Sequence, residues 1–98
     1  MVKGRAQPGK RDEIRGLFET HLAPRALANA AQPIVVWCAD NGDPDAFYLW
    51  EVYTDPAAVE ANSRAAWFVE YMAAVGPLLG GQPELTTATP VWLKPSIR

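Results

Sequence analysis

Asn62, Trp67 and Tyr71 combine polar and aromatic chemistry within one stretch that the sequence predicts to be helical. A side-chain amide such as Asn62 can both donate to and accept from the oxygen of a buried ligand. Trp67 and Tyr71 stand one helical turn apart, so they would form an aromatic wall on which a flat hydrophobic substrate stacks. An exposed or locally bonded Asn62 and simple core or dimer packing of the two aromatic rings remain alternatives.

The only histidine, His21, lies on the apolar face of another predicted helix. An imidazole there could take a proton from a phenol or an enol, because this side chain titrates near neutral pH. A histidine packed at the boundary of the core is the alternative. No second histidine, cysteine pair or carboxylate cluster stands at ligand spacing from it, so the sequence predicts no metal site.

Glu51 lies inside a predicted strand and faces the same way as apolar neighbours. A carboxylate in that position must be paired or catalytic, because burying it alone is too costly. Arg5 and Arg64 are the candidate partners, and a structural ion pair is the favoured interpretation. Trp37, like Tyr48 and Trp50, is interpreted as a core or dimer-interface residue.

One strand and one helix must position these side chains. The strand covers 46–53, where Phe47, Leu49, Glu51 and Tyr53 face one way and Tyr48, Trp50 and Val52 the other. A turn follows, in which Asp55 can cap a helix and Pro56 suits its first position. We expect one helix over 57–75 with a pocket beneath it. Its spacing predicts this core stripe: Ala58, Ala61, Ala65, Phe68, Met72 and Val75.

Outside this strand and helix, the sequence predicts one more helix and three more strands, the last of them at an edge of the sheet. A short strand, which looks like the tail of a longer one, precedes a helix from Lys10 to Ala28 that Pro24 must kink or end. The helix has an apolar face formed by Ile14, Leu17, Phe18, His21 and Leu22. An apolar strand over 33–39 leads into an Asn-Gly hairpin turn, and a last strand over 85–93 is confined to an edge by Pro90.

The order β-α-β-β-α-β predicts an α+β, ferredoxin-like domain with an antiparallel sheet, covering 1–98 with a short or truncated first strand. Two helices cover one sheet face and leave an aromatic face bare, so we expect a homodimer with the sheets face to face. The net charge of −2 predicts that the protein does not bind nucleic acid. The sequence has no apolar run long enough to span a membrane, so no membrane association is expected. The single cysteine, Cys38, fits a reducing compartment, and the cytoplasm is the expected location.

The run FYLWEVYTDPAAVEANSRAAWFVEYM resembles the signature of the antibiotic biosynthesis monooxygenase domain, a dimeric α+β barrel. The strand and turn of that signature are matched by Phe47, Leu49, Trp50, Glu51, Tyr53 and Asp55, and its helix by Phe68 and Tyr71. Upstream, Gln7 to Glu13 resembles the family's Pro-Gly-Lys entry into the first helix. The chain departs from the family at two helix positions that usually hold histidine, where it has Asn62 and Trp67.

The resemblance implies a monooxygenase that oxidises a small aromatic or quinol-like substrate with dioxygen and without a cofactor. Asn62, Trp67 and His21 are then the catalytic candidates. The predicted substrate contacts are Tyr71, Phe68, Trp50 and Glu51. The replaced histidines motivate an alternative, a non-catalytic dimer that binds a small hydrophobic molecule or serves a stress response. They argue against haem degradation and against an isomerase role, because related proteins use helix histidines for both.

Overall fold

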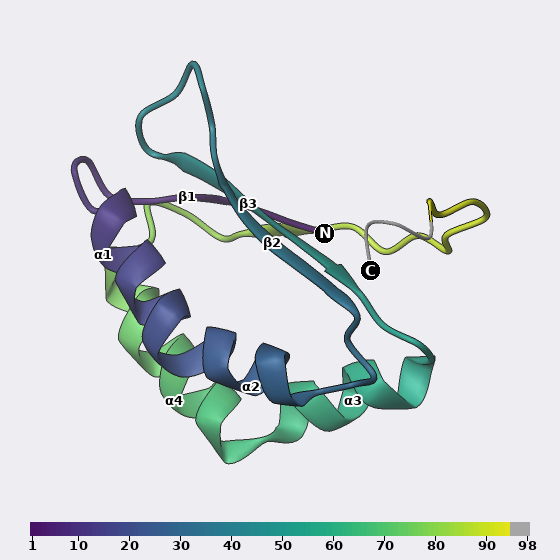
Figure 1. Ribbon diagram of the computed structural model, residues 1–98. Coiled ribbons are helices and arrows are strands. Elements are labelled where there is room, and N and C mark those ends of the chain that lie inside the picture. Colours follow the sequence, from purple (N-terminus) through teal and green to yellow (C-terminus); the bar gives the residue numbers. More distant parts are fainter. Residues whose placement is uncertain (95–98) are drawn as a thin grey trace.

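The computed structural model describes residues 1–94, which form an α+β fold with helices packed on one face of an antiparallel sheet (Figure 1). The strand order is β2-β3-β1-β4, which is the ferredoxin-like order, and it confirms the predicted fold class. The elements in chain order are β1 (Val2–Arg5), α1 (Arg11–Leu17), the π-helix η1 (Phe18–Leu22), α2 (Ala23–Ala28), β2 (Ile34–Ala39), β3 (Ala46–Val52), α3 (Pro56–Arg64), α4 (Ala66–Val75), the 3-10 helix η2 (Gly76–Leu78) and β4 (Glu84–Leu85).

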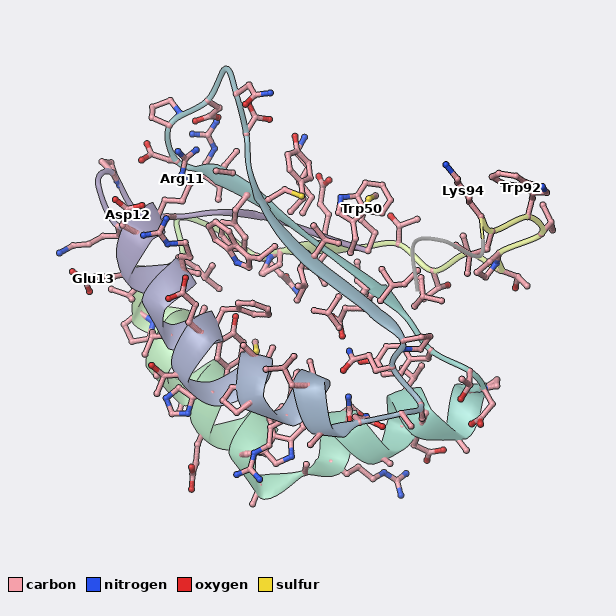
Figure 2. The ribbon with its side chains drawn as sticks, in the orientation of Figure 1. Arg11, Asp12, Glu13, Trp50, Trp92 and Lys94 are labelled. Carbon is pink, nitrogen blue, oxygen red and sulfur yellow. The ribbon has the colours of Figure 1, made fainter. Side chains whose placement is uncertain are left out.

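The hairpin between β2 and β3 forms as predicted, with register from Ile34↔Val52 to Ala39↔Phe47. Its turn is held by Asp40, whose Oδ1 accepts hydrogen bonds from two backbone N–H groups inside the turn. Arg11, at the start of α1, donates to three carbonyl oxygens of the same hairpin at 2.9–3.2 Å (Figure 2). The helical layer is therefore anchored to the hairpin end of the sheet.

The first helical segment runs from Arg11 to Ala28 and does not end at Pro24. Instead, the five residues before α2 adopt the wider π turn, and Pro24 falls in the first turn of α2. A proline fits there because the first N–H groups of a helix need no partner inside it. The π turn contains His21, and such turns are frequent at functional sites.

The predicted single helix over 57–75 is wrong in one respect, because Ala65 is extended (φ −67°, ψ 142°) and separates α3 from α4. The start is as predicted, since Asp55 accepts a hydrogen bond from the N–H of Ala58 at 3.0 Å and Pro56 opens α3. The predicted core stripe is correct only in part. Val75 is buried as predicted, but Met72 is exposed and Tyr71, which lies outside the stripe, is buried. The spacing assumed one continuous helix, and the break at Ala65 interrupts it.

The last predicted strand, over 85–93, is reduced to Glu84–Leu85, which pair with Lys3 and Val2 of β1. Beyond it, Met1 and Thr86 exchange two backbone hydrogen bonds, and the following residues up to Lys94 form no strand. Pro90 has no N–H to offer a ladder. Trp92 is 79% exposed and lies well away from the sheet (Figure 2).

The core lies between the helices and the covered face of the sheet. Ile14, the most deeply buried large side chain, is fully enclosed there. The other buried members of this cluster are Ala6, Phe18, Leu22, Phe47, Leu49, Tyr71 and Val75. Phe47 and Leu49 are buried, so their face of β3 is the one toward the helices. Glu51 and Tyr53 follow on the same face by alternation.

Candidate functional site

Glu51 is the centre of a hydrogen-bonded group between the sheet and the helices. Its Oε2 accepts from the amide Nε2 of Gln32 at 2.5 Å and from the hydroxyl of Tyr53 at 2.6 Å. Gln32 is only 8% exposed and lies two residues before β2, whose Val35 pairs with Glu51. The carboxylate is therefore held by two neutral donors inside a largely apolar layer.

The predicted ion pair of Glu51 is wrong. Arg5 pairs with Asp43 in the hairpin turn, and Arg64 pairs with Glu60 one turn earlier on α3 at 2.6 Å. The short-range geometry explains this difference. Arg64 reaches an i,i+4 partner on its own helix, whereas the strand directs Glu51 toward Gln32 and Tyr53.

Asn62 joins the group from α3, because its Nδ2 donates to the hydroxyl oxygen of Tyr53 at 3.3 Å. This bond completes a chain from Asn62 through Tyr53 to Glu51 and links α3 to the end of the sheet. Helix α3 buries no residue of its own. Asn62, which the sequence suggests as a ligand-binding residue, therefore points into the layer between α3 and the sheet.

Tyr71 approaches the same carboxylate from α4. Burial chiefly, and then the negative charge of Glu51, raises the pKa of Tyr71 to about 12. Burial and the hydrogen bond to Glu51 also raise the pKa of Tyr53 to about 12, although the Asn62 contact opposes this. Both phenols therefore stay protonated at neutral pH; Tyr53 donates to Glu51, and Tyr71 has a hydroxyl that can donate.

His21 lies beside Tyr71, with ring centroids 6.3 Å apart and the planes tilted by 56°. The two residues come from η1 and α4, so the π turn brings the histidine to the aromatic side of the site. The hydrogen bonds of the Glu51 group do not include His21. The structure places it next to the group and not within it.

The aromatic residues of α4 form a connected set. Phe68 lies 6.1 Å from Trp67, edge to face, and 6.4 Å from Tyr71. Trp67 packs against the core, and the guanidinium of Arg25 on α2 lies 5.9 Å from its ring centroid. A cation over an indole face is a favourable contact. Trp67 and Tyr71 are thus connected through Phe68 and not as the direct pair that their spacing predicts, and Arg25 covers the Trp67 end of the set.

Sequence reasoning missed two groups of this layer. Gln32 carried only a weak signal, a lone amide just before an apolar strand. Trp37 on β2 was assigned to packing, and its ring does stack on Phe47 at 5.4 Å, yet its indole N–H is buried without a hydrogen-bond partner among the described residues. A buried donor without a partner costs about 1–3 kcal/mol, so this N–H could be satisfied by a ligand oxygen.

Trp50 is the predicted contact that the structure does not bring to the group. It lies on the open face of the sheet, half exposed and opposite Val36 in the β2–β3 pair (Figure 2).

Two hollows in the surface of the described residues lie away from the Glu51 group. One, of about 280 Å³, is on the open sheet face beside Lys3 and Tyr48, and the other, of about 570 Å³, is on the outer side of the helices beside Leu17 and Ala74.

Among the described residues, no group of three or more histidine, cysteine or acidic side chains could hold a metal ion. None of the helices in that part of the chain has the length and apolar character needed to cross a membrane. The polar group around Glu51 consists of its carboxylate, the amides of Gln32 and Asn62, and the phenol of Tyr53, with the phenol of Tyr71 nearby. These groups can bind the oxygen atoms of a ligand and transfer protons.

The fold defines the class of protein as a ferredoxin-like α+β domain, and solved structures share it closely. A protein from Nitrosomonas europaea, named a "putative antibiotic biosynthesis monooxygenase", matches with a TM-score of 0.84 and 12% identity over 93% of this chain and 95% of that one. A protein of the same name from Caulobacter crescentus matches with a TM-score of 0.78 and 23% identity, covering 85% of this chain and 78% of that one.

A conserved protein from Methanosarcina mazei is similar as well, with a TM-score of 0.77 and 17% identity over 85% of this chain and 81% of that one. No family model matches the chain, and no curated protein matches it. At these identities, the likeness shows the fold. It confirms the fold that the resemblance in the sequence predicted, and several proteins that share this fold are named as antibiotic biosynthesis monooxygenases.

Proposed function

We propose that this protein is a cofactor-independent monooxygenase that oxidises a small aromatic or quinol-like substrate with dioxygen. The observation that carries the proposal is the hydrogen-bonded chain from Asn62 through Tyr53 to Glu51, enclosed between the sheet and the aromatic side chains of α4. The names of the structures that share the fold support the same reaction class.

The substrate lies flat against the α4 aromatic set, with Trp67 and Phe68 as stacking surfaces and Tyr71 as a donor to a substrate oxygen. Asn62 uses one amide hydrogen on Tyr53 and offers the rest of its amide to the substrate. The indole N–H of Trp37 supplies a further donor for a ligand oxygen. His21, beside Tyr71, remains the catalytic candidate from the first helix.

For an anthrone-type substrate, the reaction starts when the activated CH₂ group between the aromatic rings loses a proton. The carbanion then bonds to dioxygen and, after protonation, becomes a hydroperoxide on that carbon. Loss of the second C–H proton forms a carbonyl as the O–O bond breaks, and the leaving hydroxide takes up a proton to become water. Dioxygen is thus the oxidant, with one oxygen atom ending in the product and the other in water.

A non-catalytic dimer that binds a small hydrophobic molecule is the second candidate. It is favoured by the fact that Oε2 of Glu51 already accepts hydrogen bonds from Gln32 and Tyr53 without a ligand. Under this reading the polar group is structural, and a bound aromatic compound leaves unchanged.

The homodimer is part of the proposal. The open sheet face carries the directly opposed, exposed pair Val36 and Trp50, and an exposed apolar sheet surface is covered most economically by a second copy. A cytoplasmic location stays a prediction that rests on the single cysteine.

Oxygen uptake by metal-free protein on anthrone- and quinol-type compounds tests the function. We expect turnover by the wild type and a loss of about 10-fold or more in Asn62→Ala. Ser63→Ala is the matched control, because Ser63 is the next residue of α3 and bonds only to a backbone carbonyl of its own helix. No uptake across the panel, together with a bound and unchanged compound, would support the binding protein instead.

A further inference from the structure

The two oxygens of the Glu51 carboxylate differ in their surroundings. Oε2 accepts two short hydrogen bonds, from Gln32 at 2.5 Å and from Tyr53 at 2.6 Å, whereas no described residue donates to Oε1. Two donors on one oxygen fix the plane of the carboxylate and leave the other oxygen available. Glu51 is therefore fixed in place through Oε2, while its Oε1 can still accept a hydrogen bond or a proton.

The segment that carries Gln32 is itself docked against the end of β3. The N–H of Gln32 donates to the carbonyl of Asn29 at 3.1 Å, and the carbonyl of Ala31 accepts from the N–H of Thr54 at 2.9 Å. Thr54 directly follows Tyr53. The two donors to Glu51 therefore come from segments that are tied to each other, which keeps both at fixed positions relative to the carboxylate.

Within the hydrogen-bonded group, the carboxylate of Glu51 is the side chain that can accept a proton. Tyr53 and Tyr71 both have a pKa raised to about 12, chiefly by burial, so at neutral pH they can donate a hydrogen bond but cannot take a proton. Gln32 is a neutral amide, and His21 contacts Tyr71 without a hydrogen bond to this group. Arg5 and Arg64 are paired with other carboxylates, so neither of these two cations competes for the open oxygen.

We propose that Glu51 is the base of the reaction, acting through Oε1, and that Gln32 and Tyr53 are the residues that position it. This assignment rests on the proposed function. The proton of the substrate CH₂ group moves to Oε1, while the electron pair of the broken C–H bond stays on the substrate. After dioxygen adds, Glu51 returns that proton to the peroxide oxygen. It then takes the second C–H proton and gives it to the leaving hydroxide, which becomes water and restores the carboxylate.

Exchange of the anthrone methylene hydrogens in deuterated water, measured without oxygen by NMR, tests proton removal separately from oxidation. We expect the wild type to accelerate exchange and Glu51→Gln to lose about 100-fold of that rate. The carbonyl oxygen of the introduced amide still accepts from both donors, so the fold should be retained, which circular dichroism and the thermal midpoint check. Glu51→Asp keeps the carboxylate and should recover part of the rate.

Gln32→Leu tests the positioning role. We expect its exchange rate constant to fall about 10-fold with little change in KM, because substrate contacts remain while the carboxylate loses one holding donor. Gln82→Leu is the matched control, because Gln82 is an exposed amide in the loop before β4, and it should behave as wild type. A folded Gln32→Leu variant with unchanged kinetics would remove the positioning role.

The two proposals fail in different ways. Oxygen uptake that survives in folded Glu51→Gln would overturn Glu51 as the base and leave the monooxygenase proposal standing. Exchange that depends on Glu51 without any oxygen uptake would retain the base and overturn the oxidation. Wild-type protein that accelerates neither reaction would overturn both.

Discussion

The hydroxyl of Tyr53 donates to Oε2 of Glu51 at 2.6 Å, and the two residues are two positions apart at the end of β3. This spacing puts both side chains on the face of the sheet that the helices cover. The contact is local in sequence, yet it completes a chain that begins at Asn62 on α3. One strand end thus organises the polar part of the site.

Alkaline pH should destabilise the protein through Tyr71. Because burial raises the folded-state pKa from 10 to about 12, the tyrosine contributes stability that is fully present below pH 10 and is lost as the pH rises to 12. We expect Tyr71→Phe to reduce this loss by about 1–2 kcal/mol. Urea unfolding at several pH values between 8 and 12 measures the effect, and an identical pH dependence in both proteins would contradict it.

Acid titration should report the contact between Tyr48 and Asp40. The Tyr48 hydroxyl donates to Oδ2 of Asp40 at 2.7 Å, and this bond, with the backbone N–H groups of Asp43 and Gly42, lowers the pKa of Asp40 to about 2. The carboxylate therefore favours the folded state above its ordinary value of 3.8, and this contribution is lost as the pH falls to 2. Tyr48→Phe should move the pKa of Asp40 toward 3.8 in carbon-detected NMR. An unmoved titration would contradict the assigned cause.

Gly4 should tolerate no side chain. A Cβ added there would overlap the ring of Phe47, which is part of the core, whereas a Cβ at Gly81 meets nothing within 4 Å. We expect Gly4→Ala to lower the free energy of unfolding by about 1–3 kcal/mol and Gly81→Ala to change it little. Denaturant unfolding of the two variants compares them directly, and equal stabilities would show that the strand yields without cost.

The open sheet face should control the oligomeric state. A charge placed at Trp50 would have to be desolvated in any interface built on that face, so Trp50→Lys should convert a dimer to monomers. Val69→Lys is the matched control, because Val69 is similarly exposed but lies on α4 and not on the sheet. Sedimentation velocity distinguishes the two variants. A wild-type monomer, or an intact dimer in Trp50→Lys, would place the interface elsewhere or remove it.

The alternation of β3 predicted that Glu51 shares a face with Phe47 and Leu49, because a strand has only two faces. The sequence did not say which face the helices cover, and the burial of Phe47 and Leu49 identifies it. The break at Ala65 could not be predicted, because its neighbours include no proline or glycine and alanine favours helices. In the structure, the carbonyl oxygen of Ala65 accepts from the N–H groups of Phe68 and Val69, and α4 begins there.

The hydrogen-bond partner of Glu51 could not be predicted from the sequence either. A carboxylate in a strand signals that a partner exists, but Gln32 is 19 positions away in the chain and becomes its neighbour only through the β2–β3 pairing. The π turn that carries His21 was hidden for a related reason. Pro24 shows that the helix must adjust, but local sequence does not decide whether it ends, bends or widens.

The indole N–H of Trp37 offers the most direct measurement of where a ligand binds. It is buried without a partner among the described residues, and Val35, two residues before it on the same face of β2, pairs with Glu51. Proton–nitrogen NMR spectra resolve the four tryptophan indoles, and Trp37→Phe identifies the signal by its loss. On addition of 1,8-dihydroxyanthraquinone, a flat compound that lacks the CH₂ group, we expect the Trp37 signal to shift and saturate. A saturable shift confined to Trp50 or Trp92, or no shift at all, would contradict a site between the sheet and the helices.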